Sequence, residues 1–367
     1  MVKQLAKKGI NYFELDRLAW KTLSHSTHDV VTMSNDEAKM ILDSYSPNPK
    51  GCCLRNNLIL PIECDLQIIV PTYNNDNYLE ECMESILKQV TSYKYEVIVI
   101  NDGSTDNTAQ ILKYYENIES IHIISQENRG FSGARNRGLE KINAQYIMFV
   151  DSDDRLPDGA IQALLETAFA TDADIVDGSV YEFDKSRKTI KQKHKKKELV
   201  KNIYSLRGQP WGRVYKSYLF KNLVFPEGYW FEDTINPFSV FPNAHNAWII
   251  PDFVYEYRNT PTGITATAGN MPKVIDTYWI FSTLLKTCNI HDQEYYNMII
   301  RQIILNYKRT GQLPLEIQKA IFVLSADLVI SYCDDYQPSR RYRDVYEAIK
   351  LHDFGYFSHI AQLWMFI

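Results

Sequence analysis

The chain has 367 residues and a formal net charge of −5, a length that corresponds to about two domains. Hydrophobic residues make up 45% and charged residues 23%, and the 15 Gly and 14 Pro are too few for a low-complexity or collagen-like chain. The mild acidity argues against a nucleic-acid-binding protein, and no apolar run approaches the roughly 18 residues that a transmembrane helix needs.

Residues 1–60 are interpreted as an N-terminal extension. Helical patterns cover 5–23 and 36–42, and prolines and a glycine over 46–51 indicate a loop. The first residues lack the apolar stretch of a signal peptide, so we expect a cytoplasmic protein, with peripheral contact to the inner face of the membrane as an option. The six cysteines show no CxxC spacing and are expected to be reduced thiols.

Residues 61–270 alternate short apolar runs with helical patterns. Strands are expected over 66–70, 96–100, 120–125, 145–150 and 174–181, and helices over 79–90, 106–115 and 130–142. Near-continuous apolar strands are typical of parallel sheets that helices cover on both faces. The sequence therefore predicts an α/β domain with a mostly parallel sheet, whose ligands bind at the carboxyl ends of the strands.

A basic segment follows the last of these strands. Residues 184–201 carry nine Lys or Arg against two acids. The segment is either a solvated hairpin or loop, or a patch that faces an anionic membrane or a lipid-diphosphate acceptor.

Residues 271–367 are expected to form a helical C-terminal region. Helical patterns cover 272–288, 292–310, 314–333 and 340–351. These helices could form a homodimer, bind an acceptor or cap the core. The apolar tail over 354–367 either packs on the domain or rests on a membrane or a partner.

Asp151 and Asp153 directly follow the strand expected over 145–150, with Ser152 between them. Mg²⁺ and Mn²⁺ prefer oxygen ligands and often take one or two carboxylates together with phosphate oxygens and water. An acidic turn is the simpler interpretation, but the position after a buried strand favours a divalent-cation site.

Two further segments lie at the same predicted edge of the sheet. Asp102 follows the strand over 96–100 and could accept hydrogen bonds from a base or a ribose, or cap the next helix. The segment 130–138 opens a helix with little side-chain bulk and contains Arg135, which favours an anion-binding site. Close packing of this helix on the sheet, at Gly133 and Gly138, is compatible with that role.

Glu232 and Asp233 follow an aromatic stretch. Paired acids beside an aromatic wall suit a general base, because partial burial tunes the pKa of a carboxylate. Alone, the pair would more often be the acidic start of a helix, so both interpretations stay open at this point.

Taken together, these motifs resemble the family 2 inverting glycosyltransferases with the GT-A fold, over about residues 65–267. The matching segments, in chain order, are 70–74 (VPTYN), 101–106 (NDGSTD), 128–138 (NRG to ARNRG), 151–154 (DSDD), 210–216 (PWGRVYK), 225–228 (FPEG), 232–234 (EDT), 257–258 (YR) and 263–265 (GIT). Each motif is common alone, whereas their joint order and spacing are specific.

The resemblance implies a role for each matching residue. Tyr73 and Asp102 would hold the uracil of a UDP-sugar donor, and Asp233 would be the catalytic base beside Glu232. The metal ligands would be Asp153 and Asp151. The remaining donor-site residues implied by the resemblance are Pro71, Thr72, Arg135, Ser152 and Trp211. A loop from Arg258 to Thr265 would close over the diphosphate.

The implied activity is transfer of a single sugar from a UDP-sugar to a glycan-type acceptor, lipid-linked or protein-linked, in cell-surface polysaccharide or glycoconjugate synthesis. A processive synthase is disfavoured because no QxxRW motif occurs. A sugar-nucleotide pyrophosphorylase would carry a Gly-rich stretch in place of Val70–Asn74. A non-catalytic sugar-nucleotide or glycan-binding subunit remains the alternative.

Overall fold

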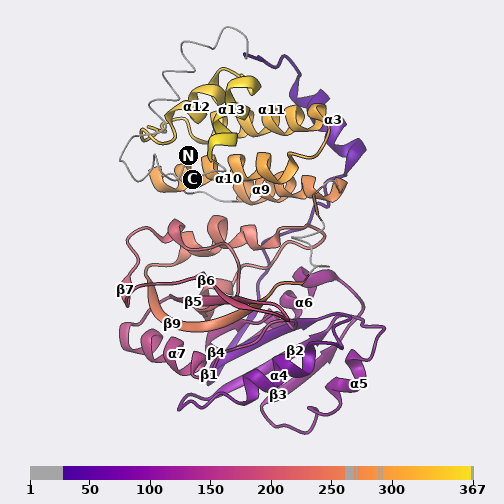
Figure 1. Ribbon diagram of the computed structural model, residues 1–367, viewed down its shortest axis with the longest axis vertical. Helices are drawn as coiled ribbons and strands as arrows, with labels where there is room; N and C mark the ends of the chain where they lie inside the picture. Colours follow the sequence, from indigo (N-terminus) through magenta and orange to yellow (C-terminus); the bar gives the residue numbers. More distant parts are fainter. Residues whose placement is uncertain (1–27, 261–267, 270, 288–289, 291, 365–367) are drawn as a thin grey trace. The chain divides into compact units, whose positions relative to one another are not determined.

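The computed structural model describes residues 28–260, 268–269, 271–287, 290 and 292–364 (Figure 1). The described chain forms two compact units, one of residues 46–295 and one that joins 28–45 to 296–364. The helix expected over 5–23 lies outside the described residues. The domain boundaries at 60 and 270 stay predictions.

A mixed sheet of nine strands forms the centre of the unit 46–295. The strands follow the order β3-β2-β1-β4-β8-β5-β9-β7, and β6 pairs with β5. Their bounds are Leu58–Thr72 (β1), Tyr95–Asn101 (β2), Ile121–Ser125 (β3), Lys141–Phe149 (β4), Ile175–Phe183 (β5), Lys188–Gln192 (β6), Glu198–Leu199 (β7), Arg213–Lys216 (β8) and Ala247–Arg258 (β9). The neighbours β3, β2, β1 and β4 run parallel, and so do β5 and β9, whereas β8, β7 and β6 are antiparallel to their neighbours.

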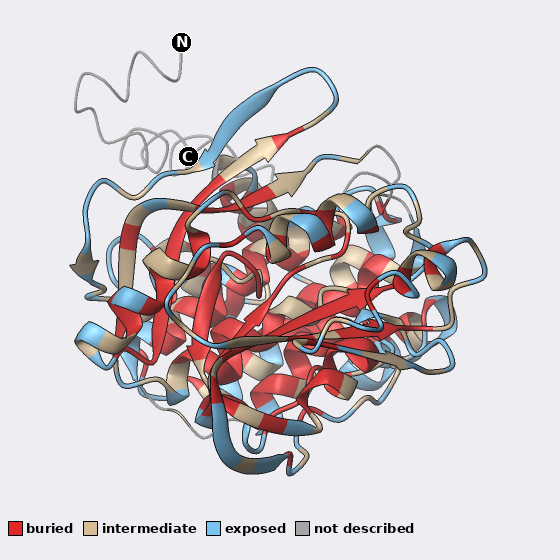
Figure 2. Ribbon diagram, turned by 90° about the horizontal axis from the view of Figure 1, so that it is seen from below, coloured by how far each residue is buried: buried red, intermediate tan, exposed pale blue. Residues whose placement is uncertain are grey.

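Helices cover both faces of this sheet, as predicted. The helices of the unit are α4 (Leu79–Leu87), α5 (Thr108–Leu112), α6 (Gly130–Leu139), α7 (Ala160–Thr171) and α9 (Asp276–Thr287). Ile68 of β1 belongs to the core cluster that includes the buried faces of α4 and α7. Its neighbour Ile69 faces α6, because successive strand residues point to opposite faces. The middle of the sheet is accordingly buried, whereas many of the connecting loops are exposed (Figure 2).

Strand β1 is longer than predicted. It begins at Leu58 rather than at 66, and its first half is largely exposed. Its pairing with β4 shifts between Ile59 and Cys64, around Pro61, which has no N–H to donate to a neighbouring strand. The exposed half lacks the continuous apolar run on which the sequence prediction rested.

The basic segment forms an exposed hairpin. Strand β6 returns from β5 and is exposed except at its last residue, Gln192. The first half of the basic segment is thus a hairpin, and the role of the segment as a patch for an anionic membrane or acceptor stays a prediction. Short helical turns complete the unit, at Ile203–Ser205, Ser217–Phe220, Glu232–Thr234, Asn236–Val240, Phe241–Asn243 and Pro272–Ile275.

The second unit consists of helices. They are α3 (Asn35–Tyr45), α11 (Leu315–Tyr332), α12 (Arg343–Lys350), α13 (Phe354–Trp364) and most of α10 (Gln293–Thr310), which begins in the first unit. The apolar tail packs within this unit as α13, where the Phe357 ring lies 4.8 Å from that of Phe322. Among the described helices, none is both long enough and apolar enough to cross a membrane.

The cysteines agree with the prediction of free thiols. Cys52, Cys53, Cys64, Cys82 and Cys333 are unbridged. Cys288 lies outside the described residues.

Gly138 lets α6 pack closely on β1. A Cβ at this position would lie 2.6 Å from Cγ2 of Ile69, closer than real carbon atoms approach. We expect Gly138→Ala to lower the free energy of unfolding by about 1–3 kcal/mol, measured by urea denaturation, because the overpacked core must shift. Gly208→Ala is the matched control, since its Cβ would make only ordinary contacts at 3.8 Å and beyond. Equal stability of the two variants would contradict this account of the packing.

Candidate active site

The predicted site residues from three strands meet at one edge of the sheet. The loop after β1 contacts the loop after β2, because Asn74 Oδ1 accepts a hydrogen bond from Thr105 N at 2.7 Å. It also contacts the loop after β4, where Asn75 Nδ2 donates to Ser152 Oγ at 2.8 Å. The carboxyl ends of β1, β2 and β4 therefore form one continuous polar surface.

Asp102 is held by the loop that leads into α6. Its side chain is 2% exposed, and Oδ1 accepts hydrogen bonds from Gln126 Nε2 at 2.6 Å and from Arg129 N at 2.9 Å. It does not cap α5, since Asp106 Oδ1 accepts the hydrogen bond from Thr108 N. The carboxylate thus has a fixed position beside the end of β1.

The end of β1 contributes one exposed ring and one buried hydroxyl. Tyr73 is 51% exposed, so its ring is available to a ligand. Pro71 pairs with Ile100 in the register of β1 and β2. Thr72 is buried, its carbonyl accepts a hydrogen bond from Asp102 N, and its Oγ1 has no hydrogen-bond partner among the described residues.

Arg135 joins two acidic segments that lie far apart in the sequence. Its Nη2 donates to Asp151 Oδ1 at 2.8 Å and its Nη1 to Glu232 Oε1 at 2.5 Å. Arg135 belongs to α6, and its side chain is buried. Burial raises the pKa of Glu232 above its usual range, against the opposing charge of Arg135. This ion-paired bridge places the Asp151 turn next to the segment that contains Asp233.

Asp233 differs from its neighbour, because it forms no ion pair with any described residue. Among the residues that the structure describes, no cation lies within ion-pair distance of the Asp233 carboxylate, and its side chain is partly exposed. Phe231, two residues earlier, adopts a left-handed backbone with φ of 63°, which is uncommon for a bulky residue. The short turn that follows leaves Glu232 bonded to Arg135 and Asp233 unpaired.

The Asp151–Asp154 turn concentrates negative charge. Burial and the charge of Asp151 raise the pKa of Asp153 to about 6. Arg258 closes the turn from the other side: its Nε donates to the Asp153 carbonyl and its backbone N–H to Asp154 Oδ1, both at 2.6 Å. Oδ2 of the buried Asp154 has no hydrogen-bond partner among the described groups.

This donor set fits a divalent cation that shares its coordination with a substrate. Asp151 and Asp153 supply hard oxygen ligands, and a cation would relieve the repulsion between them. The described residues contain no group of three or more His, Cys, Asp or Glu that could hold a metal by themselves. Diphosphate and water oxygens would have to complete the coordination.

Trp211 is buried in a stack of aromatic rings. It is 4% exposed and lies nearly parallel to Tyr255, with ring centroids 4.7 Å apart, and at 5.3 Å from Tyr257. Its predicted contact with a sugar is not tested by this packing. Tyr255 in turn accepts a hydrogen bond from Asp151 N, so the stack supports the acidic turn.

Comparison with known proteins identifies one segment that matches a known family and relatives that share part of the chain. Residues 67–227 match the model of glycosyl transferase family 2. This segment, 161 of the 367 residues, carries the similarity to the family. It is 31% identical over 215 residues to glycosyltransferase GlyA of Streptococcus pneumoniae and 33% identical over 216 residues to the uncharacterized glycosyltransferase EpsJ of Bacillus subtilis. Each alignment covers 54% of this chain, but only 31% of GlyA and 62% of EpsJ.

The same fold occurs in a solved structure. The crystal structure of S. aureus TarS 1-349 in complex with UDP-GlcNAc matches with a TM-score of 0.63 and 18% identity. The match covers 82% of this chain and 91% of that one. The GT-A fold with a mostly parallel sheet and a helical C-terminal region, predicted from the sequence, is confirmed.

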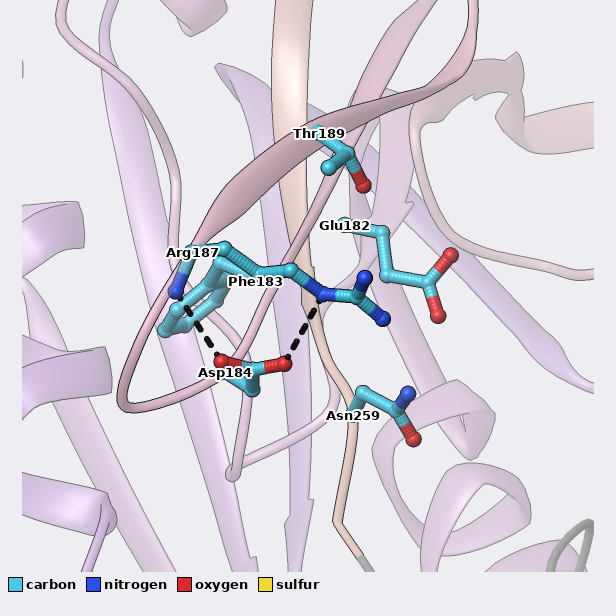
Figure 3. Close-up of a pocket in the computed structure, with 6 residues that line it drawn as sticks. All are labelled: Glu182, Phe183, Asp184, Arg187, Thr189 and Asn259. Atoms are coloured by element: carbon cyan, nitrogen blue, oxygen red, sulfur yellow. Dashed lines mark hydrogen bonds and ion pairs between the residues drawn. The ribbon is translucent and has the colours of Figure 1, made fainter.

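A small pocket lies near the Asp151–Asp154 turn (Figure 3). It is lined by Glu182, Phe183, Asp184, Arg187, Thr189 and Asn259, at the carboxyl ends of β5 and β9 and the start of β6. None of the predicted site residues lines it. Arg187 bonds to Asp184 within the pocket, while Asn259 directly follows Arg258. Residues 261–267, which contain most of the predicted closing loop, lie outside the described residues.

Sequence reasoning missed several charged residues of the glycosyl transferase domain. Asp177 of β5 is fully buried and pairs with Arg213 of β8 at 2.8 Å. Glu81 of α4 pairs with both Arg155 and Arg258, which connects α4 to the acidic turn. One signal in the sequence could have indicated a buried ion pair: Asp177 is a charged residue inside an otherwise apolar strand pattern, directly after Val176.

Proposed function

We propose that the chain is an inverting, metal-dependent glycosyltransferase that moves a single sugar from a UDP-sugar to a hydroxyl of a glycan-type acceptor. The supporting observation is the Arg135 bridge, which couples the metal-type carboxylates to the segment of an unpaired Asp233. The UDP-GlcNAc in the TarS structure supports a UDP-sugar donor. A putative teichuronic acid biosynthesis glycosyltransferase of Bacillus subtilis, 39% identical over 103 residues, supports a role in cell-surface polysaccharide synthesis.

The proposed donor site assigns distinct tasks to its residues. Tyr73 stacks on the uracil, and Asp102 accepts a hydrogen bond from the base in its fixed position. Asp151 and Asp153 hold the cation, with Asp153 the more direct ligand, and Pro71, Thr72, Ser152 and Trp211 shape the surrounding pocket. The bound cation supplies charge stabilisation for the leaving diphosphate.

The proposed chemistry needs no covalent intermediate. Asp233 removes the proton of the acceptor hydroxyl as its oxygen attacks C1 of the sugar, and the C1–O bond to the diphosphate breaks on the opposite face. The configuration at C1 inverts as a result. Arg135 keeps Glu232 ionically bound, so Asp233 alone is free to accept the proton. A general base of this kind contributes about 10²–10⁴ in rate.

UDP release from a panel of UDP-sugars, with and without Mn²⁺ and without acceptor, tests this function. We expect slow hydrolysis of one donor, abolished by a chelator. If no donor is hydrolysed but calorimetry shows UDP binding, the chain either depends strictly on its acceptor or is the non-catalytic binding subunit. If UDP does not bind at all, the donor assignment is wrong.

Asp153→Asn tests the metal assignment directly. Loss of one anionic oxygen ligand should weaken Mn²⁺-dependent UDP binding by about tenfold or more, which corresponds to at least roughly 1.4 kcal/mol. Calorimetry with UDP in Mn²⁺ measures this, and UDP without metal gives the baseline. Asp158→Asn, at an exposed position near the turn, is the matched control and should bind like the wild type. Unchanged metal-dependent affinity in Asp153→Asn would refute the assignment.

A further inference from the structure

A buried cluster with excess positive charge lies beside the proposed site. Asp177 Oδ1 is 2.8 Å from Arg213 Nη2 and 3.4 Å from Arg207 Nη2, and Asp177 Oδ2 is 2.8 Å from His194 Nε2. Arg213 and Asp177 are fully buried, and the Arg207 side chain is 19% exposed. Two guanidinium groups thus share one carboxylate.

Arg207 is incompletely neutralised. Its Nε and Nη1 are buried and have no hydrogen-bond partner among the described groups, so only Nη2 contacts Asp177. Arg213 Nη2 lies closer to the same carboxylate oxygen, at 2.8 Å, and the three guanidinium nitrogens of Arg213 likewise have no hydrogen-bond partner among the described groups, so one carboxylate charge faces two buried cations. A buried cation with unmatched donors is costly unless an anion pairs with it. The arrangement therefore fits a planar oxyanion that binds two N–H groups of the guanidinium.

The position of Arg207 relates this cluster to the proposed base. Its Cζ lies 5.2 Å from the centre of the Trp211 ring, on the stack that supports the acidic turn. The next residue, Gly208, packs against the Asp233 backbone, with 3.8 Å between its would-be Cβ and the Asp233 carbonyl oxygen. Asn236 Nδ2 also donates to the Gly208 carbonyl at 2.5 Å. The segment 207–208 is thus fixed to the turn that presents Asp233.

Exposed lysines extend the positive charge from the buried cluster to the protein surface. His194 is anchored on the cluster through Asp177 and through its N–H to Ser179 Oγ at 3.0 Å. The flanking Lys193, Lys195 and Lys197 are exposed, and no described carboxylate lies within ion-pair distance of them. Lys196, in contrast, pairs with Glu198 at 2.8 Å. The anchored segment therefore holds unpaired cations next to the buried cluster.

We propose that Arg207 binds a phosphate or carboxylate group of the acceptor next to the hydroxyl that Asp233 deprotonates, and that Lys193, Lys195 and Lys197 contact further anionic groups of the same acceptor. The acceptor is accordingly an anionic glycan or polyol. This inference rests on the proposed function, because it assigns the acceptor side of the same site. Asp177 and Arg213 act as positioning residues that hold the guanidinium group of Arg207 in place.

Calorimetric titration of the full chain, with UDP and Mn²⁺ saturating the donor site, tests the proposal. The probes are sn-glycerol 3-phosphate, methyl glucuronide and neutral methyl glucoside. We expect at least one anion to bind about tenfold or more tighter than the neutral glycoside, and the stronger of the two identifies phosphate or carboxylate as the recognised group. Equal affinity for all three probes would overturn the proposal.

Arg207→Gln should remove most of the preference for the anion while UDP affinity stays unchanged, and Arg207→Lys should retain part of it. An unchanged preference in Arg207→Gln would overturn the assignment of Arg207. If this variant fails to fold, the triple variant Lys193→Gln, Lys195→Gln, Lys197→Gln decides, because its positions are exposed. Because these lysines are proposed to contact further anionic groups, the probe for this variant is a short glycerol phosphate oligomer. The triple variant should lose several-fold affinity for the oligomer and much of the salt dependence, whereas Lys113→Gln, also exposed, should not. Wild-type behaviour of the triple variant would refute the proposal.

The two proposals fail in different ways. If the wild type does not bind UDP, the donor assignment is wrong, but the same titrations without UDP still show whether Arg207 selects an anion. If UDP binds normally and no anion is preferred, only the acceptor assignment is wrong.

Discussion

Asp233→Asn is expected to lower the rate of sugar transfer by about 10²–10⁴-fold, because the amide cannot accept the proton of the acceptor hydroxyl. UDP binding should stay at the wild-type level, since Asp233 forms no ion pair with the described part of the donor site. The variant preserves size and shape, so a loss of activity reports on proton transfer rather than on packing. Single-turnover transfer with saturating donor and acceptor measures the chemical step.

Two comparisons make this result specific. Asp252→Asn removes a carboxylate at an exposed position of β9 and should transfer sugar at the wild-type rate. Glu232→Gln should instead weaken the bond to Arg135 and lower stability as well as activity. Transfer by Asp233→Asn at the parental rate would refute the assignment of the base.

The second large effect is expected for Arg135→Met. This substitution removes the cation between Asp151 and Glu232 and leaves the buried Glu232 carboxyl without a counter-charge. Breaking a buried pair from one side costs about 3–5 kcal/mol of unfolding free energy, measured by urea denaturation. The loss should be larger at neutral pH than in mild acid, because burial already raises the pKa of Glu232 and protonation removes the unpaired charge.

Arg129→Met is the matched control for this loss. Arg129 pairs with Glu227 at 2.6 Å, but the two side chains are 41% and 33% exposed. An exposed pair contributes about 0–1 kcal/mol, so the control should be nearly as stable as the wild type. A similar small effect of both substitutions would show that the Arg135 bridge is not a stabilising element.

The parallel half of the sheet could be predicted from the sequence, because a strand that is buried on both faces consists of an unbroken run of apolar residues. Ile68, Ile69 and Val70 are all fully buried, and the same unbroken apolar pattern marks β2 and β4. The acidic turn was predictable for the same reason, since Asp151 follows the buried end of β4. In each case the decisive signal lies within a few residues of the feature.

Contacts between segments that lie far apart in the sequence could not be predicted, because no local sequence pattern indicates them. The pairing of Arg135 with Glu232 joins positions 97 residues apart, and nothing near either residue indicates the other. The stacking of Trp211 on Tyr255 likewise has no signal near either residue, because only the folded chain brings β9 beside Trp211. The excess charge around Arg207 follows likewise from the pairing of β5 with β8, which only the folded sheet establishes.

The helical unit combines one segment that precedes residues 46–295 in the sequence with one that follows them. This arrangement determines the order in which the two units can form during synthesis on the ribosome. Residues 46–295 are complete, and can fold, before the helices α11 to α13 have been synthesised. The segment that precedes α3 has its partners among these late helices: Phe354 N donates to the Asp29 carbonyl, and Lys319 pairs with Asp29 at 2.8 Å. During translation, the early segment 28–45 therefore remains without its native partners until the last part of the described chain emerges.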